Sequence, residues 1–119
     1  NAEKEVCVFA SEHDITNFYH SGFLDKLEKT SRKNMNVQLL TNYSPKSCFF
    51  IERIKLKNAK YSLSEVDELP TFILTDNGQL LLLIRNNDGK KRVAALWTNY
   101  DAFGKSLKTL FLELWNNDS

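Results

Sequence analysis

The sequence predicts an α/β (α+β) domain in which helices pack on a mixed β-sheet. A β-rich run at residues 5–10 is followed by a helical pattern and a second β-rich run, which is typical of a parallel βαβ unit. The C-terminal half instead shows β-rich runs separated by tight turns, which predict antiparallel hairpins, and it ends in an amphipathic helix. A chain of 119 residues, 42% of them hydrophobic, suits one domain with its own core.

The first β-rich run, residues 5–10, predicts a buried strand, and a helix is expected after the polar segment 11–14. Asp14 or Thr16 can cap this helix, and residues 34–36 end it. A second strand is expected at residues 37–40. The apolar positions of the helix fall at helical spacing: Ile15, Phe18, Tyr19, Phe23 and Leu27.

The middle of the chain is less regular. Residues 41–45 form a loop by composition, and residues 47–54 predict a short helix with an apolar side. Residues 55–68 carry the most charge, with one short strand expected near residues 59–63.

The C-terminal half is expected to form a meander of strands. A strand at 71–75 leads into the sequence Asp-Asn-Gly at 76–78, a tight-turn signal because Asn and Gly tolerate positive φ. The strand at 79–85 is apolar on both faces and is therefore expected at the centre of a covered sheet. A turn at 86–89 and a strand at 91–98 follow. The last helix begins near Asn99 or Asp101 and places Phe103, Leu107, Leu110, Phe111 and Leu114 on one face.

Charge and cysteine content exclude several classes of function. Sixteen basic and 15 acidic residues give a net charge of +1, which gives no support for direct contact of this segment with nucleic acid or a membrane surface. Cys7 and Cys48 are too few for a disulfide scaffold, and we interpret them as reduced thiols of a cytoplasmic domain. The longest apolar run, 80–84, is far shorter than a membrane span. Because the chain starts without Met, we expect residues 1–119 to be a single domain excised from a longer protein.

The sequence contains no strong catalytic or metal-binding motif. His13 and His20 are seven positions apart without a nearby cysteine or paired carboxylate, so neither a metal nor another cofactor is expected. No nucleophile-elbow or glycine-rich phosphate loop occurs. His13 follows the first strand, where open α/β sheets bind ligands. Three roles are open for His13. It contacts a ligand, it is an exposed loop residue without a function, or it works beside Glu12 or Asp14 as an ionisable group in an enzyme of another type.

A pocket of aromatic walls and polar groups is one hypothesis for the site. It requires the second strand and the last strand to end at the same edge of the sheet. The ligand-binding residues would then be Ser11, His13, Tyr43, Trp97, Thr98 and Asn99. Simple packing of the aromatic rings in the core or at its rim is the alternative.

The hairpin and the end of the chain resemble a known family. In the phospholipase D fold each half carries H-x-K-x-x-x-x-D on a strand that runs into a turn; aligned on Asp76, its His falls on Leu69 and its Lys on Thr71. The sequences Ala-Leu-Trp-Thr-Asn at 95–99 and Leu-Phe-Leu-Glu-Leu-Trp at 110–115 resemble the ending of regulatory domains in archaeal TrmB-type transcriptional regulators, with related segments beside archaeal sensor histidine kinases. The resemblance implies a single phospholipase D-like half whose catalytic motif is degenerate.

The expected function is therefore non-catalytic. Leu and Thr supply neither the imidazole nucleophile nor the ammonium group that phosphodiester transfer by that fold needs. Asp76 is expected to serve its turn, with its carboxylate bonded to backbone N–H groups of the hairpin. We expect a domain that senses a small ligand (a sugar or metabolite) and relays its state to an output domain in the same polypeptide, and the resemblance implies a homodimer. The alternative is a dimerisation or interaction module without ligand.

Overall fold

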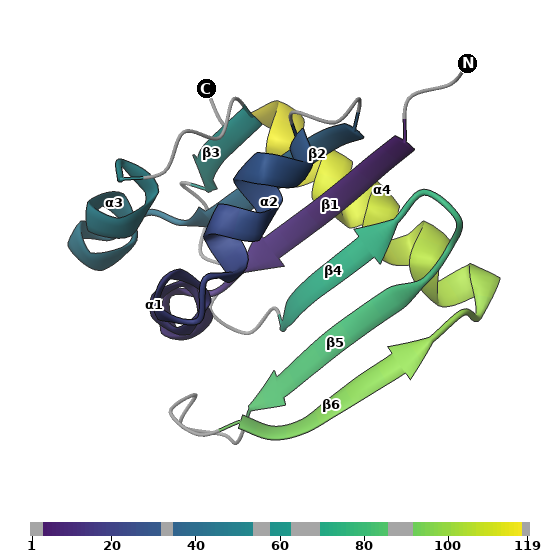
Figure 1. Cartoon of the computed structure of the whole chain (residues 1–119). Helices are drawn as coiled ribbons and strands as arrows, with labels where there is room; N and C mark the ends of the chain where they lie inside the picture. Colours follow the sequence, from purple (N-terminus) through teal and green to yellow (C-terminus); the bar gives the residue numbers. More distant parts are fainter. Residues whose placement is uncertain (1–3, 32–34, 54–57, 63–69, 86–91, 118–119) are drawn as a thin grey trace.

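The computed structural model describes residues 4–31, 35–53, 58–62, 70–85 and 92–117. These residues form a mixed six-stranded sheet in the order β3-β2-β1-β4-β5-β6 with four helices packed on it, which confirms the predicted α+β class (Figure 1). The strands are β1 (Lys4–Ala10), β2 (Met35–Asn42), β3 (Asn58–Ser62), β4 (Thr71–Thr75), β5 (Leu80–Arg85) and β6 (Arg92–Thr98). The helices are α1 (Glu12–His20), α2 (Phe23–Ser31), α3 (Pro45–Ile51) and α4 (Asp101–Asn117).

The sheet has a parallel half and an antiparallel half that meet at β1. β1 pairs parallel with β2, as the βαβ pattern predicted, and β2 pairs parallel with β3. On its other side β1 pairs antiparallel with β4, and β4, β5 and β6 follow as an antiparallel meander. The hairpin turn between β4 and β5 contains Gly78 at φ +85°, a left-handed conformation that glycine adopts without steric cost.

The helix expected after β1 is two helices, because the chain breaks at Gly22. This residue has φ +84°, and Ser21 ends α1 by donating its N–H to the Asn17 carbonyl at 2.9 Å. The expected caps, Asp14 and Thr16, are wrong, since α1 begins after Ser11. Helix α3 begins earlier than expected, because Ser44 and Ser47 form a capping box and Pro45 fits the first turn.

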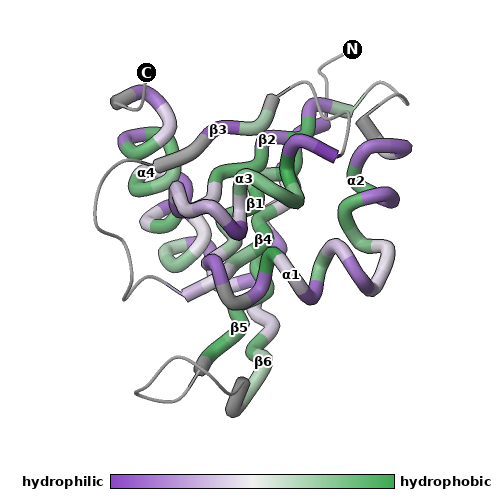
Figure 2. Tube along the Cα trace, turned by 90° about the vertical axis from the view of Figure 1, so that its left-hand side faces the viewer, coloured by the Kyte–Doolittle hydropathy of each residue, from purple (hydrophilic) through white to green (hydrophobic). Residues whose placement is uncertain are grey.

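Two apolar cores lie on opposite faces of the sheet. One face is covered by α1, α2 and α3, and the other by α4 (Figures 1 and 2). Successive residues of β1 point to opposite sides, so Val8 joins the first core and Cys7 and Phe9 the second. Phe111 and Trp115 anchor α4 in the second core, where their rings stack at a centroid distance of 5.7 Å.

The antiparallel end of the sheet is less covered than the sequence predicted. β5 is the second strand from the edge rather than a central strand, and Ile84 on it is exposed. Phe103, expected on the core face of the last helix, is also exposed and packs against the ring of Tyr100 at 5.0 Å. The expected turn at 86–89 lies outside the described residues. Among the helices that the structure describes, none is long and apolar enough to cross a membrane.

Candidate functional site

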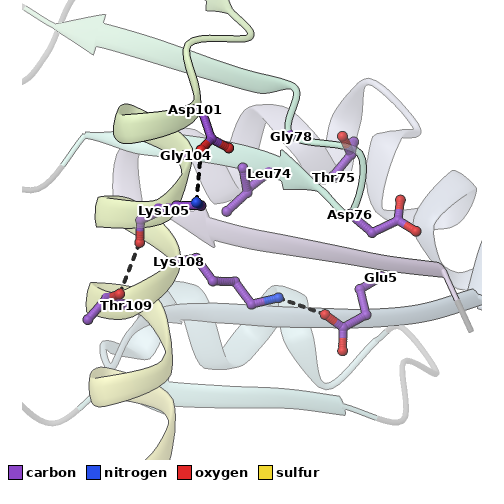
Figure 3. Close-up of a pocket in the computed structure, with 10 residues that line it drawn as sticks. All are labelled: Glu5, Leu74, Thr75, Asp76, Gly78, Asp101, Gly104, Lys105, Lys108 and Thr109. Carbon is purple, nitrogen blue, oxygen red and sulfur yellow. Dashed lines mark hydrogen bonds and ion pairs between the residues drawn. The ribbon is translucent and has the colours of Figure 1, made fainter. Parts of the chain in front are cut away.

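An open groove lies between the terminal helix and the hairpin at the amino end of β1. Its volume is about 480 Å³, and α4 forms one wall while β1, β4 and the β4–β5 turn form the other (Figure 3). Leu74 is its apolar floor, and Gly104 of α4 lies opposite Leu74. The lining residues are Glu5, Leu74, Thr75, Asp76, Gly78, Asp101, Gly104, Lys105, Lys108 and Thr109.

An ion pair across the groove ties α4 to the sheet. Lys108 Nζ lies 2.6 Å from Glu5 Oε1, and the two residues are 103 positions apart in the chain (Figure 3). The hydrogen bond to Glu5 raises the pKa of Lys108, and partial burial offsets this only in part. Lys108 therefore keeps its proton at neutral pH, and its bond to Glu5 holds the helix against the strand.

A second ion pair lies within the helix. Lys105 Nζ is 2.9 Å from Asp101 Oδ2 at a separation of four residues, and both side chains are exposed. Surface pairs of this kind add little to stability. Because both side chains are exposed, the ammonium group of Lys105 and the carboxylate of Asp101 are accessible to solvent and to a molecule that enters the groove.

Cys7 lies behind this wall, in the core under α4. Burial raises the pKa of the Cys7 thiol, and the Lys108 ammonium group lowers it by a smaller amount. The thiol donates to Gln38 Oε1 at 3.8 Å. A buried thiol with a raised pKa is a poor nucleophile, so Cys7 acts here as a small core residue.

Asp76 does not have the structural role predicted from the sequence. Its backbone N–H donates to the Glu5 carbonyl at 3.0 Å, which joins the turn to β1. The hydrogen bonds that close the turn come from Thr75, whose N–H donates to the Gln79 carbonyl at 2.9 Å. Among the described residues the Asp76 carboxylate has no hydrogen-bond or ion-pair partner, and it is an exposed charge on the rim of the groove.

A buried polar cluster lies at the opposite edge of the sheet, where β1 ends and β4 begins. The Ser11 N–H donates to Thr71 Oγ1 at 2.9 Å, and the Ser11 hydroxyl donates to Asp14 Oδ2 at 3.3 Å. Thr71 and Asp14 are both buried. Thr71 stands where the resemblance aligns the catalytic lysine, and its hydroxyl is used to hold the loop after β1; Leu69 lies outside the described residues.

The six residues predicted to bind a ligand do not form one pocket. β6 runs antiparallel to β1 and β2. The C-terminal ends of β2 and β6 therefore lie at opposite ends of the strands of the sheet. Ser11 and Tyr43 therefore lie at the carboxyl edge of the parallel strands, with His13 in the first turn of α1. Trp97, Thr98 and Asn99 lie at the other edge, where Thr98 Oγ1 accepts the Tyr100 N–H at 3.0 Å.

The groove residues were missed because they come from both ends of the chain. Glu5 meets Lys108 only through the packing of α4 on β1, which no local pattern reveals. The isolated glycine at 104 gave no clear signal, because a single glycine is tolerated inside a helix at a cost of about 1 kcal/mol relative to Ala. A Cβ built there would lie 3.5 Å from Leu74 Cδ1.

Among the described residues, no group of three or more His, Cys, Asp or Glu side chains is placed to hold a metal ion. A scan against models of known protein families finds no match, and a search of curated proteins finds no similar sequence.

Proposed function

We propose that this chain is a non-catalytic sensor domain of a transcriptional regulator or sensor kinase, and that a small polar ligand binds in the groove between α4 and the β4–β5 turn. The observation that carries the proposal is the ion pair between Lys108 and Glu5, with the groove beside it. A molecule in this groove contacts the terminal helix and the sheet together. Binding therefore changes how α4 rests on β1, and α4 passes that change to an output domain of the same polypeptide.

The charges of the groove favour a ligand that carries an amino group. Three carboxylates and two lysines line it, and each lysine already has a carboxylate partner. The third carboxylate, Asp76, has no partner among the described residues, so their charges leave the groove with an excess of negative charge beside an apolar floor at Leu74. An ammonium group is the natural partner of such a carboxylate. None of the described residues that line the groove is aromatic, so stacking walls for a sugar are not found among them.

The non-catalytic part of the proposal is supported by the environment of Thr71. This residue is buried and hydrogen-bonded to Ser11, so no cationic side chain stands where the resemblance aligns the catalytic lysine. Detection of phosphodiesterase turnover that depends on Asp76 would contradict it.

A thermal-shift screen tests the sensor proposal. The panel pairs amino acids and polyamines with the corresponding hydroxy acids and diols, together with sugars and nucleotides. A ligand that binds only the folded state stabilises it by about 2.7 kcal/mol at one hundred times its dissociation constant. We expect shifts for amino compounds and none for their hydroxy counterparts.

The location of binding is tested with charge-neutral variants at exposed positions. Asp76→Asn should abolish the shift, and Lys105→Gln, which removes a positive charge and frees the Asp101 carboxylate, should enlarge it, whereas Lys26→Gln on α2, exposed and outside the groove, should leave it unchanged. A shift that survives Asp76→Asn but is lost in Ser11→Ala would place the ligand at the carboxyl edge of the parallel strands instead. No shift with any compound would contradict the sensor proposal.

A second candidate function is an interaction module without ligand. The exposed apolar residues of β6 and of the start of α4 favour it. Absence of ligand binding together with self-association would support this alternative.

A further inference from the structure

β6 is an edge strand without the usual protection of an edge. It is the last strand of the sheet and pairs only with β5 among the described elements. Natural edge strands avoid pairing with other chains through charged residues, proline or bulges. The segment 94–98, Ala-Ala-Leu-Trp-Thr, has neither charge nor proline, and its register with β5 from Leu80 to Ile84 is uninterrupted; the irregularity lies beyond it, at Ile84/Arg85.

Apolar side chains are exposed on both faces of this edge. Leu96 lies opposite Leu82 on the face that α4 covers elsewhere, and it is 45% exposed. Trp97 lies opposite Leu81 on the other face and is 56% exposed. Figure 2 shows the β5–β6 hairpin, largely apolar, reaching beyond the helices. A partner that packed on one face of the sheet would cover only Leu96 or only Trp97. A strand that pairs alongside β6 covers part of both side chains.

We propose that β6 pairs with β6 of a second copy of this chain, in antiparallel orientation, so that the two sheets join into one. A two-fold axis places the same strand on both sides, and antiparallel pairing of a strand with itself satisfies that symmetry. Each edge then supplies the N–H and C=O groups that the other lacks. The net charge of +1 gives little repulsion between copies. The proposal is independent of ligand binding in the groove.

The exposed apolar area fits a dimer interface. Trp97, Tyr100 and Phe103 are 56%, 60% and 50% exposed and lie along β6 and its continuation into α4. Because an aromatic side chain buries about 150–250 Å² when it is fully covered, these three rings expose roughly 300 Å². A standard interface buries about 800 Å² on each partner. Leu96, Ile84 and the backbone of the strand are placed to supply the remainder.

The oligomeric state of the chain tests the proposal. Sedimentation equilibrium from micromolar to submillimolar concentration should give the mass of two chains. Leu96→Lys and Trp97→Lys, which place a charge on either face of β6, should each give monomers. Leu112→Lys, at an exposed leucine of α4 away from β6, should remain dimeric. Circular dichroism melts verify that all three variants fold.

Three outcomes would overturn the proposal. A wild-type monomer at every concentration removes the dimer. A dimer that persists in both lysine variants places the interface elsewhere. Loss of the dimer in Trp97→Lys with retention in Leu96→Lys indicates that copies pack face to face and do not pair their strands.

A cysteine scan tests strand pairing directly, in a Cys48→Ala background where the remaining native thiol, Cys7, is buried. Residues opposite each other in an antiparallel pair have Cα atoms about 4.5–5.5 Å apart, within the range that a disulfide spans. Four variants are made, each with one new cysteine at residue 94, 95, 96 or 97, and each variant is oxidised separately. We expect disulfide-linked dimers to peak at the position nearest the two-fold axis and to be absent for Leu112→Cys. An absent or uniform yield along β6 would contradict strand pairing.

Discussion

Replacing Thr71 with Val tests the hydrogen bond that closes the carboxyl edge of β1. Thr71 is 1% exposed, and its hydroxyl accepts the Ser11 N–H at 2.9 Å. Val has nearly the same shape but no acceptor, so the Ser11 N–H loses its partner. Leaving one half of a buried hydrogen bond unpaired costs about 1–3 kcal/mol. Since Ser11 is only half-buried, we expect the free energy of unfolding to fall by about 1–2 kcal/mol, roughly 4–8 °C in Tm for a chain of this length.

Thr41→Val is the matched control, with the opposite expected sign. Thr41 is also 1% exposed, but its Oγ1 has no hydrogen-bond partner among the described residues. Replacing an unpaired buried hydroxyl with a methyl group removes a polar atom that was taken out of water without compensation. We therefore expect Thr41→Val to leave the free energy of unfolding unchanged or to raise it by about 1 kcal/mol.

Urea unfolding at equilibrium measures both variants, and the m-values should match that of the wild type if only stability changes. Equal destabilisation of the two variants would refute the reasoning, because it would mean that the hydrogen bonds of these hydroxyls do not decide the outcome. A neutral Thr71→Val would show that water replaces the hydroxyl at the Ser11 N–H.

Three further predictions concern pH and glycine. Burial raises the pKa of Cys7 in the folded chain, and the hydrogen bond to Glu5 raises the pKa of Lys108. The unfolded chain therefore loses these two protons at lower pH than the folded chain does. As a result, the free energy of unfolding falls as the pH rises above the ordinary pKa values of 9.0 for Cys and 10.5 for Lys. Denaturation at stepped alkaline pH checks this, and a decline that starts no later in Cys7→Ala would contradict the assignment of the first part. Gly22→Ala should cost about 1 kcal/mol in urea unfolding, and Gly22→Asn less, because φ is +84° and no atom lies within 4 Å of the added Cβ; equal effects would point to another cause. Gly104→Ala should raise stability by about 0.5–1 kcal/mol, because the added methyl only contacts Leu74 at 3.5 Å, and a lower stability would show that α4 has no room to spare.

The secondary structure followed from the sequence wherever a local pattern determined it. The two β-rich runs around a helical pattern predicted the parallel unit, the Asp-Asn-Gly turn predicted the first hairpin, and the mixed sheet follows from the two together. The prediction was wrong where a single backbone angle determines whether a helix continues or ends. The break at Gly22 was missed because an isolated glycine inside a helical pattern reads equally well as a tolerated helix residue.

The candidate site was harder to predict, because it depends on the order of the strands. Three antiparallel pairings separate β1 from β6, and each reverses the chain, so Trp97 and Asn99 end far from Ser11. Strand order is a property of long-range pairing that no window of residues encodes. For the same reason the Glu5–Lys108 pair could not be anticipated, whereas the unprotected composition of β6 was already readable from 94–98 once its edge position was known.

The central position of β1 has a consequence for how the chain acquires its structure during synthesis. The strand is synthesised before the strands it pairs with: Val6 pairs with both Val37 and Thr75, and Glu5 meets Lys108 only after the residues between them have been made. Contacts so distant in sequence slow folding, because a long loop must close before they form. The backbone N–H and C=O groups on one side of β1 therefore stay unpaired until β4 has been translated. During that interval the nascent chain exposes an unpaired apolar strand and is the form most in need of a chaperone.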